Sequence, residues 1–411
     1  MQTNIDVKYK NNIHIQDAED ILRSCVHCGF CTATCPTYQL LGDELDSPRG
    51  RIYLIKQVLE GNDATEKTQN HLDRCLTCRS CETTCPSGVR YGRLLDIGRE
   101  IVEQQVSRTT GNKFKRFLLR KILPYPTRFS LLLKAGQLTR PILPKSLKNK
   151  IPEVNKNDIL QSGNSFERKM LMLDGCAQRV ATPSTNNATI RIFSKLGIEI
   201  INTPKARCCG AVSHHLSAEE EAKAFIKHNI DCWWPEIEKG VEAIIITASG
   251  CGTMVKDYGE ILKHDAQYAD KASRISELCK DVSEIITNEA DRLKEITSKT
   301  SNNMNTKSIA FHSPCSLQHG QKIIGLVEKI LTNVGFKLVT VVDSHLCCGS
   351  AGTYSILQPT LSNQLLSNKL NTLQKEQPDI IATANIGCQL HLSSKSERPV
   401  KHWVELLNEV L

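Results

Sequence analysis

One cysteine pattern occurs twice in the first quarter of the chain, and it limits the fold of this region more than any other feature. Residues 25–36 read CVHCGFCTATCP, and residues 75–86 read CLTCRSCETTCP. Each segment has the spacing C-x2-C-x2-C-x3-C-P, which is typical of proteins that hold two iron–sulfur clusters. Three closely spaced thiolates can wrap one corner of a cubane cluster. The fourth cysteine, held away by its proline, then points to the other cluster.

This spacing predicts two [4Fe–4S] clusters that exchange one ligand between the two segments. The first cluster is expected to use Cys25, Cys28, Cys31 and Cys85. The second is expected to use Cys35, Cys75, Cys78 and Cys81. Zinc is the alternative, but a zinc ribbon uses paired C-x2-C knuckles that supply two ligands each. Two neighbouring clusters are typical of a carrier of single electrons.

Helices are expected around both cysteine segments. Ser47 has the chemistry of an N-cap, Pro48 suits the first helical position, and Gly61 ends an apolar stripe of helical period. A second helical pattern covers roughly residues 66–72 and leads into the second cysteine segment. These signals predict an α-helical ferredoxin domain.

The chain has 18 cysteines in 411 residues, which favours metal or redox chemistry over disulfides in a reducing compartment. Its first residues, MQTNIDVKYKNN, lack the apolar stretch of a secretory signal peptide. The apolar runs are far shorter than the roughly 20 residues of a membrane span. We therefore expect a cytoplasmic chain.

The C-terminal part contains an internal repeat with four cysteines in each copy. At separations of 137 or 139 residues, Cys176, Cys208, Cys209 and Cys251 match Cys315, Cys347, Cys348 and Cys388. Each copy follows the order strand, helix, strand, Cys-Cys-Gly, helix and strand, which predicts an α/β module with a parallel sheet. Loops that follow parallel strands meet at one sheet edge, so each set of cysteines is expected to converge there.

The two sets of four thiols could each hold an iron–sulfur cluster, a zinc ion or nothing. We favour a metal site in at least one module, and buried free thiols are the alternative. Gly210 is expected to take a positive φ that lets the adjacent cysteines face one point. His312, His345 and His391 lie near these cysteines and are interpreted as hydrogen-bond donors or packing residues rather than ligands. Cys232 and Cys279 are expected to be structural.

The net charge of +8 originates in one segment. Residues 104–152 contain 12 of the 52 Lys and Arg residues and no Asp or Glu, which leaves 40 basic against 44 acidic residues elsewhere. The interleaved Phe and Leu suit contact with anionic lipid or an acidic partner. The alternative is a solvated linker whose leucines pack on the repeat modules. Nucleic-acid binding is not expected, because no recognition motif accompanies the charge.

The predicted fold class is a multidomain α+β chain. Residues 1–103 form an α-helical ferredoxin domain with two clusters, and residues 104–167 form a basic connector. Residues 168–305 form the first cysteine-rich module, and residues 306–411 form the second.

Over essentially its whole length the chain resembles the iron–sulfur subunits of bacterial glycolate oxidases (glycolate dehydrogenases). The resemblance rests on both cysteine segments and on TASGCGTMVKDYG, DSHLCCGSAGTY and TANIGCQLHL. It implies a ferredoxin domain, two CCG domains, flavin-containing partner subunits that oxidise glycolate to glyoxylate, and electron delivery toward respiratory quinone. It also implies peripheral contact with the cytoplasmic face of the inner membrane.

The chain is similar, more loosely, to subunits of anaerobic glycerol-3-phosphate dehydrogenase, lactate-utilisation complexes and heterodisulfide reductase. Heterodisulfide reductase-like CCG domains end in C-x2-C. In this chain the position of the second cysteine holds Met254 after Cys251 and His391 after Cys388. A cluster that needs five thiolates is therefore not expected, which also argues against a thiol–disulfide reductase.

No G-x-G-x-x-G after a strand and no P-loop is found, so the chain is expected to need a flavoprotein partner. No residue is assigned a catalytic role, and the chain alone is not expected to be active. The alternative functions are a subunit of a related lactate or glycerol-3-phosphate dehydrogenase and a redox-sensing iron–sulfur protein.

Overall fold

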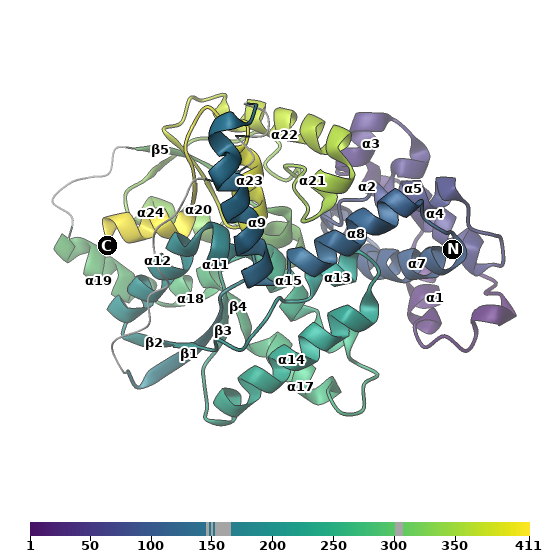
Figure 1. Ribbon diagram of the computed structural model, residues 1–411, viewed down its shortest axis with the longest axis horizontal. Coiled ribbons are helices and arrows are strands. Elements are labelled where there is room, and N and C mark those ends of the chain that lie inside the picture. The colour runs from purple at the N-terminus through teal and green to yellow at the C-terminus, as the bar shows by residue number, and fades with distance from the viewer. Residues whose placement is uncertain (145–147, 149–150, 153–165, 301–306) are drawn as a thin grey trace.

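The computed structural model describes residues 1–144, 148, 151–152, 166–300 and 307–411. A helical N-terminal part lies at one end of the long axis, and two parallel sheets with their helices fill the rest (Figure 1). Part of the predicted basic connector, including most of residues 145–165, falls outside the described residues.

The N-terminal part is α-helical, as its sequence predicts. Its helices are α1 (Ile15–Ser24), α2 (Phe30–Ala33), α3 (Pro36–Leu41), α4 (Pro48–Leu59), α5 (Glu66–Asp73), α6 (Ser80–Thr84) and α7 (Tyr91–Gln105). The predicted cap of α4 is confirmed, because the Ser47 hydroxyl accepts a hydrogen bond from the Gly50 N–H at 3.0 Å. Helices α1, α4 and α7 bury one apolar cluster that includes Leu22, Ile55 and Leu94.

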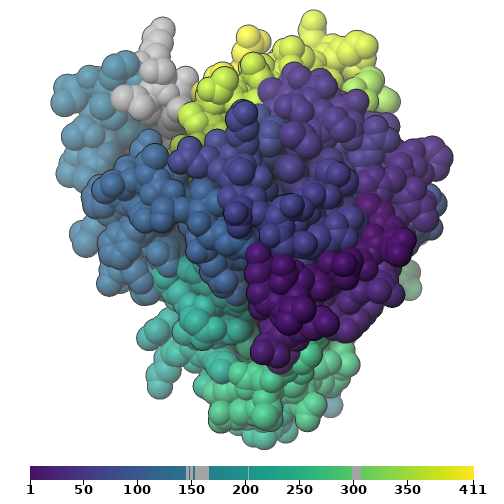
Figure 2. All heavy atoms as spheres, turned by 90° about the vertical axis from the view of Figure 1, so that its right-hand side faces the viewer, coloured from purple at the N-terminus to yellow at the C-terminus, as the bar shows by residue number. Residues whose placement is uncertain are grey.

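The described part of the connector contains two α-helices, α8 (Thr110–Ile122) and α9 (Pro126–Thr139), and a short 3-10 helix (Arg140–Ile142). They lie on the surface between the N-terminal part and the two modules (Figure 2). Phe129 and Leu133 of α9 pack against a small apolar cluster of Ala181, Ala248 and Ile386 from both modules. This contact matches the alternative interpretation, in which leucines of the connector pack on the modules.

Each module contains a four-stranded parallel sheet. The first has the order β2-β1-β3-β4 and consists of β1 (Arg168–Leu173), β2 (Ile198–Asn202), β3 (Ile244–Ile246) and β4 (Cys279–Asp281). The second has the order β6-β5-β7-β8 and consists of β5 (Ser308–His312), β6 (Lys337–Leu338), β7 (Ile380–Thr383) and β8 (Val400–His402). The repeated parallel α/β module is therefore confirmed. The fourth strand of each sheet was missed, because these three-residue strands lack an apolar run.

Helices connect the strands of both modules. In the first module they are α11 (Gln178–Ala181), α12 (Pro183–Lys195), α13 (Ala211–His215), α14 (Glu219–Glu238), α15 (Ser249–Lys256), α16 (Tyr258–Ile261), α17 (Ala269–Leu278), α18 (Val282–Asn288) and α19 (Ala290–Thr300). In the second they are a π-helical turn (Ser316–Gly320), α20 (Leu326–Asn333), α21 (Tyr354–Leu357), α22 (Pro359–Gln374), α23 (Ile386–Ser393) and α24 (Trp403–Val410).

The two modules share one hydrophobic core. Helix α12 contacts α24, and α18 contacts α20, so a layer of four helices lies between the two sheets (Figure 1). Phe193, Ile286, Leu331 and Trp403 are fully buried in this layer. The opposite face of each sheet packs against α14, α15 and α17 or against α22 and α23, close to the module cysteines.

Candidate functional site

The cysteines of the two N-terminal segments line two adjoining cavities. A cavity of about 420 Å³ is lined by Cys25, Cys28, Cys31, Cys81 and Cys85. A second cavity, of about 310 Å³, is lined by Cys35, Cys75, Cys78 and Cys81. Each predicted set of four therefore meets in one cavity, including the cysteine that comes from the other segment. Cys81 lines both cavities, so the two sites are direct neighbours.

The two segments form the same loop. In the first segment His27 and Gly29 have φ of 56° and 86°, and in the second Thr77 and Arg79 have φ of 53° and 58°. These positive φ values at matching positions curl each loop so that its first three cysteines face one side. Arg79 is held in this uncommon conformation while its guanidinium forms an ion pair with Asp257 of the first module.

The donor chemistry of both cavities fits [4Fe–4S] clusters. The eight cysteines are free thiols, and burial raises the pKa of Cys31 to about 11 and the pKa of Cys81 well above its usual range. Because such thiols stay protonated without a nearby positive charge, a bound metal is what would favour their thiolates. Each predicted set of four thiols matches the ligand number of a cubane cluster, and Cys81 of the second set also reaches the first cavity.

The two cavities differ in their access to solvent. At the first, Cys28 is exposed, and the neighbouring Val26 and Phe30 are 68% and 61% exposed. At the second, Cys78 packs in one apolar cluster with Cys315 and Cys347 of the second module. The first set of cysteines therefore reaches the surface at Cys28, whereas the second set adjoins the second module.

The four cysteines of the first module come from three loops. Cys176 follows β1, Cys208 and Cys209 follow β2, and Cys251 lies in the first turn of α15. The sulfur atoms of Cys176 and Cys208 are 3.5 Å apart. Hydrogen bonds from the Cys208 and Cys251 thiols hold the pKa of Cys209 well below its usual range. The predicted convergence at the sheet edge is therefore present.

The second module repeats this arrangement. Cys315 follows β5, Cys347 and Cys348 follow β6, and Cys388 lies in the first turn of α23. The sulfur atoms of Cys315 and Cys347 are 3.8 Å apart, and Cys348 interacts with both Cys347 and Cys388. In both modules the last cysteine thus lies at a helix N-terminus, where the backbone N–H groups favour a thiolate.

The glycine of each Cys-Cys-Gly motif is required by the packing behind it. Gly210 and Gly349 have φ of 94° and 87°, as expected for Gly210 from the sequence. A Cβ on Gly349 would lie 2.6 Å from the Ser362 carbonyl oxygen, and one on Gly210 would lie 3.2 Å from the Ala222 carbonyl oxygen. The motif loop therefore lies directly against helix α22 or α14, which fixes the two cysteines before it.

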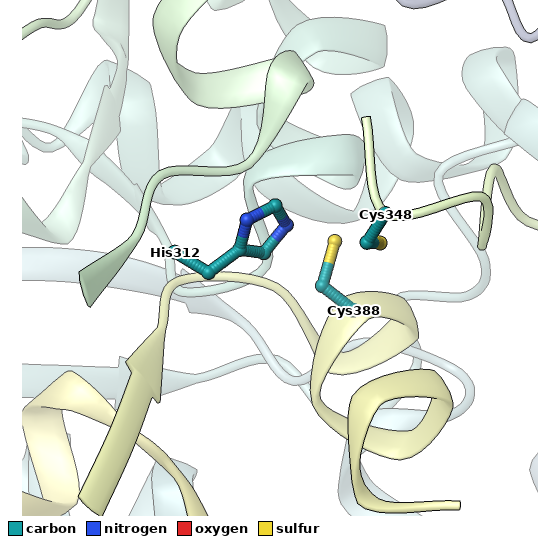
Figure 3. Close-up of side chains that lie close together, drawn as sticks. All are labelled: His312, Cys348 and Cys388. Carbon is teal, nitrogen blue, oxygen red and sulfur yellow. The ribbon is translucent and has the colours of Figure 1, made fainter. Parts of the chain in front are cut away.

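His312 occupies a position that its sequence interpretation did not anticipate. Its ring lies beside the sulfur atoms of Cys348 and Cys388 (Figure 3), and the three donor atoms are within 4.8 Å of one another. The side chain is buried, and neither ring nitrogen has a hydrogen-bond partner in the described part of the chain. Of the two roles expected for it, hydrogen-bond donor or packing residue, this environment matches only packing. His391 does interact as expected, since its Nε2 lies 3.1 Å from the Ser362 hydroxyl.

Cys232 and Cys279 have no counterpart in the repeat, and Cys279 lies beside the first set, with its sulfur 3.9 Å from the Gly252 carbonyl oxygen. The Cys232 sulfur is 3.5 Å from His228 Nε2, and Cys279 is buried on β4. Sequence reasoning also missed Lys369 of α22, which is 3% exposed and donates to the Asp343 carbonyl at 2.7 Å. No local pattern signalled a buried lysine there.

The comparisons with known proteins agree with this geometry. A family model for a 4Fe-4S dicluster domain matches residues 21–89, and one for a cysteine-rich domain named CCG matches residues 170–256 and 309–393. The chain is 53% identical to the glycolate oxidase iron-sulfur subunit of Escherichia coli (strain K12), over the full chain and 99% of that protein. The chain belongs to the glycolate oxidase iron–sulfur subunit family.

More distant relatives share parts of this architecture. The chain is 29% identical to the probable glycolate oxidase iron-sulfur subunit of Bacillus subtilis (strain 168), over 92% of the chain and 90% of that protein. It is 24% identical to lactate utilization protein A of Geobacillus sp. (strain WCH70), over 58% of the chain and 99% of that protein. The resemblance noted from the sequence is thus confirmed, and the chain is an iron–sulfur subunit of an oxidoreductase complex. Among the described residues, no helix has the length and apolar character needed to cross a membrane.

Proposed function

We propose that this chain carries electrons in a complex that oxidises glycolate to glyoxylate, between flavin-containing subunits and the respiratory quinone pool. The observation that carries the proposal is the pair of adjoining cavities, each of which gathers one predicted set of four cysteines and both of which are lined by Cys81. Each [4Fe–4S] cluster, when bound, takes up and releases one electron at a time. The full-length identity to a glycolate oxidase iron-sulfur subunit supports the choice of substrate.

The proposed ligands follow the cavities. Cys25, Cys28, Cys31 and Cys85 would hold the cluster near the surface. Cys35, Cys75, Cys78 and Cys81 would hold the cluster under the second module. The module cysteines, Cys176, Cys208, Cys209 and Cys251 with Cys315, Cys347, Cys348 and Cys388, would form two further metal sites, for zinc or an additional cluster.

The exposure of the first cavity supports a contact with a partner subunit at this place on the surface. An electron donor or acceptor on another subunit can approach the first cavity, because Cys28 is exposed there between Val26 and Phe30. Beside the second cavity, Leu76 and Cys78 pack against Tyr354 and other residues of the second module. Residues 1–103 would then serve as the electron-carrying domain, joined by residues 104–167 to modules at 168–305 and 306–411.

The exchange of ligands between the segments gives a sharp test. Each variant is purified anaerobically, and its iron content and EPR spectrum are measured during reductive titration. Cys85→Ser should give the same spectrum as Cys28→Ser, because both remove a ligand of the surface cluster. Cys35→Ser should instead match Cys78→Ser. Cys232→Ser is the control and should leave both signals intact.

The opposite grouping would refute the ligand assignment, since Cys85→Ser would then match Cys78→Ser. For the function, the assembled complex should reduce a quinone analogue with glycolate, and loss of either cluster should abolish this activity. Glycolate oxidation by the isolated chain would refute the need for a flavin subunit.

The connector supports a proposal of peripheral contact with the cytoplasmic face of the inner membrane. Several of its basic residues are used inside the chain, since Arg116 pairs with Asp73 at 3.0 Å and Arg120 pairs with Glu221 at 2.8 Å. Others stay exposed among apolar side chains, namely Lys113, Phe114, Lys115, Phe117, Leu131, Leu132 and Lys134. Such a surface suits the interface of anionic lipid.

Sedimentation with vesicles that contain anionic phosphatidylglycerol tests this contact. The double variant Lys113→Glu/Lys115→Glu should lose most of its binding, whereas the exposed control Lys375→Glu on the second module should not. Unchanged sedimentation of the double variant would refute the lipid contact and leave an acidic partner as the occupant.

A further inference from the structure

We infer that the metal site of the second module binds its metal through the imidazole of His312 in addition to thiolates, and that the first module binds through thiolates alone. This inference rests on the proposed function only for the statement that the module cysteines bind metal. The ligand is a thiophilic metal, either a zinc ion or an iron of a cluster, and the test separates the two.

The first observation is the position of the ring. Strand β5 directs Ala310 and His312 to the same face of the sheet, and Ala310 packs there with Cys348 and Cys388. The imidazole lies between β5 and the first turn of α23, next to both sulfur atoms (Figure 3). One donor atom from each of His312, Cys348 and Cys388 lies within 4.8 Å of the others. Ligands of one tetrahedral zinc ion stand about 3.8 Å apart, given zinc–sulfur bonds of about 2.3 Å.

The second observation is that this ring has no other role. His312 is 2% exposed, and neither of its nitrogens makes a hydrogen bond to any residue that the structure describes. Leaving a buried polar group without a partner destabilises a folded protein. The other two buried histidines of this module have partners for both nitrogens. Those of His319 are the Thr83 hydroxyl and the His345 carbonyl, and those of His402 are the Thr247 carbonyl and the Val404 N–H. A metal bond would give His312 the partner that the protein does not supply.

The third observation is the difference between the two copies of the repeat. When Cys176 is aligned with Cys315, Leu173 of β1 is the residue equivalent to His312 of β5. Leu173 is buried in the apolar core of its module. The first module therefore offers four sulfur donors, whereas the second offers four sulfur donors and one nitrogen donor.

A buried cation accompanies the extra donor. Ser362 of α22 and Ala222 of α14 are the residues that contact the two motif glycines. Lys369 and Asn229 each lie seven residues later, so they occupy matching positions in the two helices. The charge of Lys369 interacts with Cys348 and Cys347. A buried ammonium group favours negatively charged thiolates nearby, and it is specific to the second module. The two modules are thus built for centres of different ligand composition.

Metal analysis of the full chain tests the inference. His312→Leu reproduces the residue of the first module, and His312→Gln serves if that variant does not fold. His319→Gln is the matched control, since it also removes a buried histidine from the second module. The His312 variants should retain metal at the second module at least tenfold more weakly in competition with a chelator, whereas His319→Gln should match the unchanged chain.

Spectroscopy identifies the bond and the metal. If iron occupies the module, pulsed EPR should show a histidine ¹⁴N coupling that changes with ¹⁵N-histidine labelling and disappears in His312→Gln. If zinc occupies it, replacement by Co²⁺ should give a tetrahedral absorption spectrum that shifts in His312→Gln. An unchanged spectrum together with unchanged metal retention would overturn the inference.

The cysteine variants separate this result from the parent proposal. If Cys348→Ser and Cys388→Ser lower the metal content and His312→Gln does not, only the role of His312 is refuted. If none of the three changes the metal content, the second module is not a metal site and the parent proposal fails for this module.

Discussion

Substitution of the motif glycine in the second module should be far more damaging than substitution of a glycine with the same backbone conformation elsewhere. Gly349 has φ of 87°, and its Cβ would meet the Ser362 carbonyl oxygen at 2.6 Å. A non-glycine residue in this region costs about 1–2 kcal/mol. Relief of the contact requires a backbone shift that costs about 1–3 kcal/mol more, as in an overpacked core. Gly349→Ala should therefore lower the free energy of unfolding by about 2–5 kcal/mol.

Two other glycines separate these two costs. Gly335 has φ of 94° with no atom within 4 Å of its Cβ position, so Gly335→Ala measures the conformational cost alone. Gly210 has a Cβ contact of 3.2 Å and should fall between the two. The free energies of unfolding are compared by urea denaturation of the metal-free chains under anaerobic conditions. In the metal-loaded chain, Gly349→Ala should also lower metal retention at the second module, because Cys347 and Cys348 immediately precede the displaced residue.

Equal destabilisation by Gly349→Ala and Gly335→Ala would refute this reasoning. It would mean that the loop moves away from α22 without cost, and that contact with Ser362 does not position the cysteines.

Two further predictions concern buried charges in the N-terminal part. Asp46→Asn should destabilise the chain by about 3–5 kcal/mol, because it removes the carboxylate that lies 3.2 Å from the Arg51 guanidinium, which is 1% exposed. Thermal denaturation tests this, and the exposed control Asp63→Asn should change little. Burial and the neighbouring Glu219 raise the pKa of Glu100 to about 7. The folded chain therefore holds this proton more tightly than the unfolded chain, and stability falls as the pH rises from about 4.5 through 7. Glu100→Gln should raise the melting temperature at pH 8 and leave it nearly unchanged at pH 5, and an equal gain at both pH values would contradict the shift.

Features encoded by neighbouring residues were predicted from the sequence. The cap of α4 joins Ser47 to a backbone N–H only three positions later. The sequence signal for this cap is therefore contained in Ser47 and the PRGR that follows it. The three cysteines of each N-terminal loop span seven residues, and their spacing alone indicates a shared cluster. The repeat was visible because strands and helices recur in register.

Features created by distant contacts could not be predicted. Strands β4 and β8 are three residues long and have no apolar run that would mark them in the sequence. They join their sheets because the preceding segments, α17 and the chain before β8, place them beside β3 and β7. The layer formed by α12, α18, α20 and α24 depends on the two modules packing face to face. The periodicity of each helix shows an apolar face but not its partner.

The sequence by itself determined which thiols belong together, because the cysteine spacing and the 139-residue register are properties of the chain. Only the tertiary structure decided that Cys81 lines both cavities, that Cys78 packs beside Cys315, and that His312 lies beside Cys388 without a hydrogen-bond partner. These contacts join residues up to 237 positions apart, as between Cys78 and Cys315. These long-range contacts form because folding buries apolar surface between helices and sheets. The same packing brings together donor atoms that are far apart in the sequence.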